Sequence, residues 1–277
     1  MSPPSPCSSD VFPRTETRVF GFAVTQADAA GIARAVATRR RGEADGVGLV
    51  VTPNLDHVVQ LRRDAALARA YRRAEVIACD GFPVRYYSRA RGMPVGAATG
   101  CDIAAALMRA ECFEPWQRLF FVVDGAATEA GVRAWAVRKG LADRVATCVP
   151  PPGFQGDPEF CAGLAARIRA HGTSTLVMGV GAPRSEVFVD THRAALPPCW
   201  ALCVGQAVKI EVGLVTRAPG LVRRLHGEWA WRIAQEPRRL ARRYLVGSAV
   251  FLLAVAEDLF DARLRRLAWR RVEEGRA

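Results

Sequence analysis

Short, continuously apolar segments alternate with longer segments of helical pattern along most of this 277-residue chain. The apolar segments do not alternate with polar residues, so the strands that they form are buried on both faces. Strands separated by helices of about ten residues run parallel, because each crossover returns the chain to the same edge of the sheet. The pattern therefore predicts an α/β fold with a mostly parallel, Rossmann-like sheet flanked by helices.

The expected elements follow from this pattern. We expect strands at residues 18–24, 48–51, 76–79, 119–123, 145–149, 175–178 and 200–204. We expect helices at residues 26–40, 56–73, 83–91, 102–112, 128–140, 158–170 and 184–195. Thr25, followed by Asp28, predicts a capped start for the first helix. After about Gly213 the pattern indicates helices alone.

The chain divides into three predicted parts: a disordered tail (1–17), an α/β domain (18–213) and a basic helical appendage (214–277). Eight arginines and two glutamates fall between Arg217 and Arg243, so about half of the net charge of +12 lies in this stretch. Such a concentration predicts an anionic partner, namely nucleic acid, a phosphorylated ligand or a membrane surface. A solvated basic face is the alternative.

Several classes of protein are excluded. No Cys-x-x-Cys pair occurs, no His spacing completes a metal site, and the four histidines are interpreted as structural or surface residues, so we expect no metal and no cofactor. Neither a Gly-x-Ser-x-Gly elbow nor a P-loop is present. The start of the chain lacks the apolar segment of a secretion signal, and the apolar run 244–256 is too short to span a bilayer. We therefore expect a cytoplasmic protein.

Polar residues directly after the apolar strands are the candidate site residues, because ligands of open parallel sheets bind at the carboxyl ends of the strands. Asp80 follows the strand 76–79 and is a candidate general base. A turn, or a cap for the next helix, is the alternative for Asp80. Thr52 and Asn54 could bind a ligand, or Asn54 could cap the helix after it.

A glycine-rich corner at residues 179–184 joins a predicted strand to a helix and is a candidate phosphate site. The third glycine of a dinucleotide fingerprint is missing, as is the acidic residue that would bind a ribose. The corner therefore argues for phosphate of some kind and against a nicotinamide cofactor.

Taken in order, these motifs resemble those of the WecG/TagA/CpsF glycosyltransferases (glycosyltransferase family 26). The motifs are Thr52-Pro53-Asn54 with Asp56-His57, Asp80-Gly81-Phe82-Pro83, Gly100-Cys101-Asp102, Gly179-Val180-Gly181-Ala182-Pro183-Arg184 with Glu186, Arg217-Ala218-Pro219, Glu228-Trp229-Ala230-Trp231-Arg232, and Glu236-Pro237-Arg238-Arg239. The resemblance covers about residues 18–250.

The resemblance implies an inverting, metal-independent enzyme. It would move a hexose or N-acetylhexosamine, of the N-acetylmannosaminyl or glucosyl type, from a nucleotide sugar such as a UDP-sugar. The acceptor would be a polyprenyl-diphosphate-linked sugar at the inner face of the cell membrane, in the synthesis of exopolysaccharide or another cell-surface glycan. The implied partners are donor, lipid-linked acceptor, membrane surface and a second copy of the chain, with no nucleic acid.

The resemblance also assigns roles to residues. It implies that Asp80 is the general base and that Thr52 lies beside it in the pocket. The implied substrate-binding residues are Asn54, Asp102, Gly179, Gly181, Pro183, Arg184, Glu186, Arg217, Arg232 and Arg239. Three departures from the family pattern are Ser185 at a glutamine position, Lys209 near a usual aspartate, and Cys101 at a hydroxyl position. They leave open a catalytically altered member, and the basic tail leaves open a nucleic-acid-binding protein.

Overall fold

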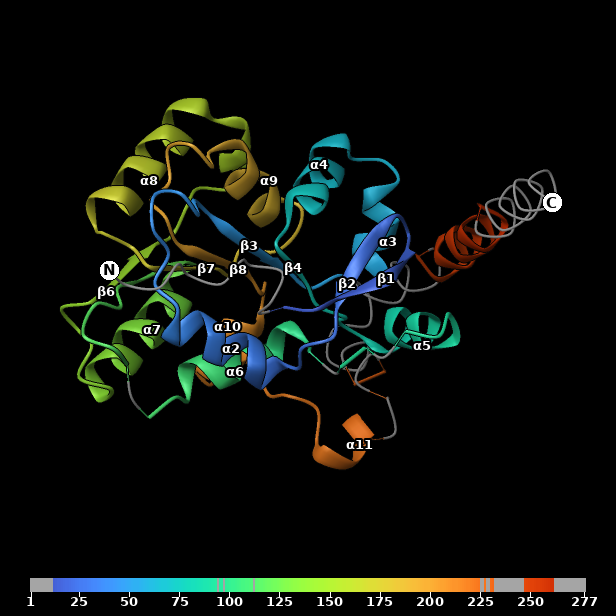
Figure 1. Cartoon of the computed structure of the whole chain (residues 1–277). Helices are drawn as coiled ribbons and strands as arrows, with labels where there is room; N and C mark the ends of the chain where they lie inside the picture. Colours follow the sequence, from blue (N-terminus) through green and yellow to red (C-terminus); the bar gives the residue numbers. More distant parts are fainter. Residues whose placement is uncertain are drawn as a thin grey trace, which may run out of the picture.

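The computed structural model describes residues 12–93, 95–96, 98–111, 113–224, 227, 230–231 and 247–261. Its centre is a six-stranded parallel sheet with the strand order β4-β3-β8-β7-β5-β6 (Figure 1). The strands are β3 (Gly48–Val51), β4 (Val76–Ile77), β5 (Leu119–Val122), β6 (Val145–Cys148), β7 (Thr175–Met178) and β8 (Trp200–Cys203). The predicted α/β fold with a parallel sheet is confirmed.

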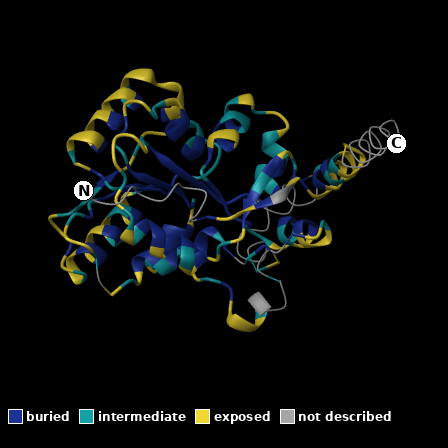
Figure 2. Ribbon diagram, in the orientation of Figure 1, coloured by how far each residue is buried: buried dark blue, intermediate teal, exposed yellow. Residues whose placement is uncertain are grey.

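Helices cover both faces of the sheet. One face is covered by α3 (Leu55–Leu61), α4 (Ala65–Arg73), α8 (Pro158–Ala170) and α9 (Arg184–Thr191), and the other by α2 (Ala29–Thr38), α6 (Gly100–Met108), α7 (Ala126–Arg138) and α10 (Ala207–Glu211). Successive strand residues enter opposite cores: Leu49 and Val51 pack in one, Val50 in the other. This double burial explains why the strands are continuously apolar, and Figure 2 shows them dark blue beneath helices with exposed outer faces.

The first strand differs from the prediction. Instead of one strand at residues 18–24, the chain forms an antiparallel hairpin of β1 (Arg14–Val19) and β2 (Phe22–Thr25). The turn consists of Phe20 and Gly21, both with positive φ. The predicted disordered tail, residues 1–17, includes residues that are ordered. Phe12 is buried and packs edge-on against Trp200, with ring centroids 5.6 Å apart. Residues 1–11 lie outside the described residues.

Two helix boundaries are corrected by capping. The predicted helix 56–73 is broken into α3 and α4, because Asp64 caps α4 and accepts a hydrogen bond from the backbone N–H of Leu67 at 2.9 Å. The first helix begins at Ala29 and not at residue 26, because the cap is Asp28 itself, which accepts from the N–H of Gly31 at 2.7 Å. In both cases an aspartate competes with helix continuation.

Residues 247–261 form a helix that packs against the hairpin and α5 (Phe82–Ala90) (Figure 1). Phe251 is buried in the core that lies beneath α3 and α5. Asp258 accepts hydrogen bonds from the backbone N–H of Phe20 at 2.9 Å, from the hydroxyl of Tyr87 at 2.6 Å and from Arg91 at 2.6 Å. Among the described residues, no helix has the length and apolarity that crossing a membrane requires.

The remaining short elements are η1 (Phe154–Gly156), a 3-10 turn before α8, and α11 (Gly220–Arg224), which follows the cleft-lining segment described below.

Candidate active site

A cleft of about 280 Å³ lies at the carboxyl edge of the sheet. Five strands deliver residues to its lining: Thr52 and Asn54 after β3, Asp80 after β4, Asp124 after β5, Gly179, Val180, Gly181 and Ala182 after β7, and Val204, Gly205 and Gln206 after β8. The segment 215–218 and Trp231 line the cleft as well. The cleft thus lies where open α/β sheets bind their ligands.

Asp80 is held in the cleft by its backbone. Its N–H donates to the carbonyl of Pro53 at 3.1 Å, which fixes the ends of β4 and β3 side by side. The next residue, Gly81, has a φ of 81° and is the N-cap of α5 without a side-chain hydrogen bond. Asp80 therefore does not cap this helix, and its half-buried carboxylate lines the cleft.

Thr52 and Asn54 have different surroundings. Thr52 is buried, and its hydroxyl donates to the carbonyl of Cys203 at 3.4 Å. A Cβ on Gly100 would lie 3.1 Å from that hydroxyl oxygen, so a side chain at this position would push Thr52 or α6 aside by a few tenths of an ångström. Asn54 caps α3 as the sequence alternative suggested: its Oδ1 accepts from the N–H groups of Asp56 at 3.0 Å and His57 at 3.3 Å.

The glycine-rich corner after β7 is tightly packed. The N–H of Gly179 donates to the carbonyl of Val122 at 2.7 Å, and a Cβ on Gly179 would lie 3.3 Å from that oxygen. Gly181 has a φ of 79°, and Pro183 follows a cis peptide bond. Arg184 lines the cleft and donates back to the carbonyl of Val180, whereas Pro183 is not among the lining residues.

Ser185, at the position where the family pattern has glutamine, does not reach the cleft lining. Its side chain is buried, and its hydroxyl donates to the carbonyl of Gly181 at 3.2 Å. The shorter side chain therefore fastens the corner from within.

Glu186 lies behind the cleft rather than in its lining. It is 2 % exposed, and its Oε1 lies 3.6 Å from Nε2 of His57, which does line the cleft. The ring Nδ1 of His57 lies 2.8 Å from Oδ1 of Asn54. The sequence analysis interpreted His57 as a structural or surface residue, whereas the structure places it in the lining of the cleft.

Burial raises the pKa of Tyr71 well above its ordinary value, and the negative charges of Glu186 and Asp80 raise it further. Its phenol therefore stays neutral behind the cleft.

Arg217 enters the cleft from the segment after α10. It donates to Asp102 at 2.7 Å, and Asp102 also accepts from the hydroxyl of Thr99 at 2.7 Å. Arg217 lines the cleft, whereas Asp102 supports it from the first turn of α6. Arg232 and Arg239, which the sequence also predicted, lie outside the described residues.

The sequence analysis also missed Asp124 and Gln206. Asp124 directly follows the apolar residues 119–123, as Asp80 follows 76–79, and Gln206 follows the strand 200–204 after one glycine. The rule that selected Asp80 would have found them. Lys209 pairs with Asp124 at 2.6 Å, so its charge is engaged at the edge of the cleft. Within the described ranges, no three His, Cys, Asp or Glu side chains are grouped as metal ligands.

A parallel sheet with a polar cleft and a glycine-rich strand-to-helix corner at its carboxyl edge is the arrangement with which many α/β proteins bind phosphorylated ligands. A model of the glycosyl transferase WecG/TagA/CpsF family matches residues 17–265. The chain therefore belongs to this family, as its motifs suggested, and is a glycosyltransferase that uses a nucleotide-sugar donor.

Proposed function

We propose that this protein is an inverting glycosyltransferase that moves a hexose or N-acetylhexosamine from a UDP-sugar to a polyprenyl-diphosphate-linked sugar, in the synthesis of exopolysaccharide or another cell-surface glycan. The observation that carries the proposal is the placement of Asp80 and the glycine-rich corner on opposite sides of one cleft. β3 and β8 separate β4 from β7, and neighbouring strands are about 4.8 Å apart. This separation leaves room for a sugar attached to a diphosphate.

In the proposed reaction Asp80 takes the proton of the acceptor hydroxyl, whose oxygen attacks the anomeric carbon of the donor sugar. The bond from that carbon to the diphosphate oxygen breaks, and the nucleotide diphosphate departs from the opposite face, which inverts the configuration. Thr52 lies beside the reacting groups.

The departing diphosphate gains negative charge that the protein has to stabilise. The backbone N–H of Gly181 and the side chain of Arg184 lie at the corner after β7, and Arg217 enters from the opposite segment. The N–H of Gly179 is bonded to Val122, so Gly179 shapes the corner. Glu186 and Asp102 act indirectly in this proposal, through His57 and Arg217 respectively. These donors support a metal-independent reaction.

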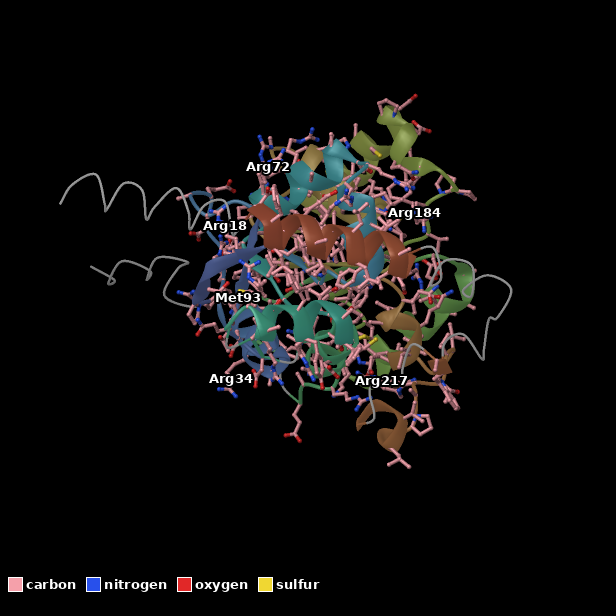
Figure 3. The ribbon with its side chains drawn as sticks, turned by 90° about the vertical axis from the view of Figure 1, so that its right-hand side faces the viewer. Arg18, Arg34, Arg72, Met93, Arg184 and Arg217 are labelled. Carbon is pink, nitrogen blue, oxygen red and sulfur yellow. The ribbon has the colours of Figure 1, made fainter. Side chains whose placement is uncertain are left out.

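The lipid-linked acceptor and attachment to the inner face of the membrane are supported by the helix 247–261. Leu252, Leu253, Leu259 and Phe260 are exposed on it, and Phe82 and Tyr86 are exposed on the neighbouring α5. Figure 3 shows this helix lying across the molecule between α4 and α5, with Arg184 and Arg217 toward the same end of it. Apolar side chains beside a lipid-diphosphate site suit a protein that lies on the headgroup layer.

The test is transfer from a panel of UDP- and GDP-sugars to a polyprenyl-diphosphate-linked sugar in detergent, with and without EDTA. We expect transfer with a UDP-sugar, an inverted linkage and no loss on chelation. A strict requirement for added Mn²⁺ or Mg²⁺ would contradict the proposal that arginines and backbone N–H groups stabilise the departing diphosphate. Donor binding without transfer to any acceptor would indicate a catalytically altered member.

A further inference from the structure

A buried carboxylate and a cleft-lining imidazole face each other behind the ligand space. Glu186 has a side chain that is 2 % exposed, and the side chain of His57 is 14 % exposed. A buried carboxylate is stable as an anion only when a cation or hydrogen-bond donors accompany it. Of the basic side chains in the described ranges, His57 is the one within ion-pair distance of Glu186.

The contact with Asn54 relates the imidazole ring to the amide. Oδ1 of Asn54 accepts from two backbone N–H groups, at 3.0 and 3.3 Å, which identifies this atom as the amide oxygen. Nδ1 of His57 lies 2.8 Å from that oxygen, a distance at which a ring with its proton on Nδ1 donates to the amide. The backbone N–H of Asn54 also approaches Nδ1, at the longer distance of 3.3 Å, and donates to it in the other tautomer. Nε2 faces the Glu186 carboxylate, with 3.6 Å between Nε2 and Oε1.

The Asn54 amide is thereby fixed in one orientation. Its oxygen serves three donors at the start of α3, and its NH₂ group donates to none of the residues that the structure describes. Asn54 lines the cleft next to Asp80, whose backbone is bonded to Pro53. An NH₂ group beside a general base is placed to bind an oxygen of the acceptor sugar.

We propose that Glu186 and His57 are positioning residues that hold the Asn54 amide so that its NH₂ group binds the acceptor beside Asp80. The inference rests on the proposed function. The contact between Glu186 and His57 also links the two halves of the cleft. Glu186 lies on α9, which follows the glycine-rich corner, and Asn54 caps α3, which follows β3.

The test compares Glu186→Gln, His57→Gln and His57→Asn in steady-state transfer. His57→Gln removes the donor at the Nδ1 position, so we expect the KM for the acceptor to rise about tenfold, the usual scale for one hydrogen bond, with the donor KM unchanged. His57→Asn places an amide N–H at the Nδ1 position and should recover most of the loss. Glu186→Gln should raise the acceptor KM by a similar factor as His57→Gln.

Asp190→Asn is the matched control. Asp190 is a second buried carboxylate on α9, bonded to Arg69 at 2.8 Å away from the cleft. Its variant should lower the thermal midpoint and leave both KM values unchanged.

In an Asn54→Ala background, Glu186→Gln should add nothing further, because the amide that it orients is gone. Additive effects, or an unchanged acceptor KM in all three variants, would overturn the proposal. The ring ¹⁵N signals of His57 in the free protein should show a proton on Nδ1. An Nδ1 without a proton would overturn the proposal, and this measurement needs no substrate. Absence of transfer by the wild-type enzyme would refute the proposed function. The ring signals of His57 do not depend on transfer, so the two failures can be told apart.

Discussion

Asp80 illustrates how the backbone positions a single residue. Its N–H is bonded to the carbonyl of Pro53, and the positive φ of the next residue, Gly81, sets the turn into α5. A substitution that keeps the shape of the side chain preserves both of these features.

Asp80→Asn should lower turnover by about 10²-fold or more, because an amide cannot accept the proton of the acceptor hydroxyl. Donor affinity and the thermal midpoint should stay close to those of the wild type. The matched control is Asp28→Asn, which lies outside the cleft and retains a good helix cap. Near-normal turnover in Asp80→Asn would remove this carboxylate from the mechanism.

The part of the site that the sequence could predict is the part set by strand ends. Thr52, Asp80 and Gly179 follow buried strands, so the parallel sheet alone brings them to one edge. His57 could not be predicted in this way, because its place depends on Glu186, a partner far away in the sequence and on another helix. Glu186 was selected by its motif, but its burial is a tertiary property.

At the scale of elements, the hairpin β1/β2 and the helix 247–261 hold each other in place. Asp258 accepts from the backbone N–H of Phe20 in the hairpin turn, and its bonds to Tyr87 and Arg91 attach the same helix to α5. Burial together with the bond to Asp258 raises the pKa of Tyr87 to about 12. The sequence did not predict the hairpin because its turn, Phe20-Gly21, lacks the Asn-Gly or Asp-Gly signal of two-residue turns.

Asp258→Ala should lower the free energy of unfolding by about 2 kcal/mol, because Tyr87 and Arg91 lose a charged partner. Chemical denaturation measures the change. Its neighbour Glu257 provides the control, since it pairs with Arg62 at the exposed surface. Glu257→Ala should change the stability little, because exposed ion pairs are screened by solvent. Equal effects of the two variants would contradict a buried network at Asp258.

At the scale of the whole molecule, stability should decrease in mildly acidic solution. Burial lowers the pKa values of His171 and His192 below 6.5, so the unfolded chain takes up protons before the folded one does. The stabilisation is present above pH 6.5 and is lost as the pH falls through the folded pKa values. Thermal midpoints measured between about pH 7 and 5 should therefore decline. The double variant His171→Asn, His192→Asn should show a shallower decline, and an unchanged slope would contradict this cause.

The proposed membrane attachment is also tested on the whole molecule. Leu252→Glu should reduce flotation with anionic vesicles, because it places a charge on the exposed apolar face of the helix 247–261. Val137→Glu is the control, since Val137 is as exposed as Leu252, at 67 %, but lies on α7 at the other side of the molecule (Figure 1). Added salt should weaken attachment without abolishing it. Equal flotation of both variants would show that this helix does not attach the protein to the membrane.

The order of the strands has a consequence for how the enzyme is made. β8 is the last strand of the sheet in sequence, yet it lies in the middle, paired with β3 on one side and β7 on the other. Before residue 203 has left the ribosome, the chain can form only two separate pieces, β4-β3 and β7-β5-β6. Asp80 belongs to the first piece and the glycine-rich corner to the second. A growing chain therefore gains the whole cleft in one late event, when β8 inserts and joins the two halves of the sheet.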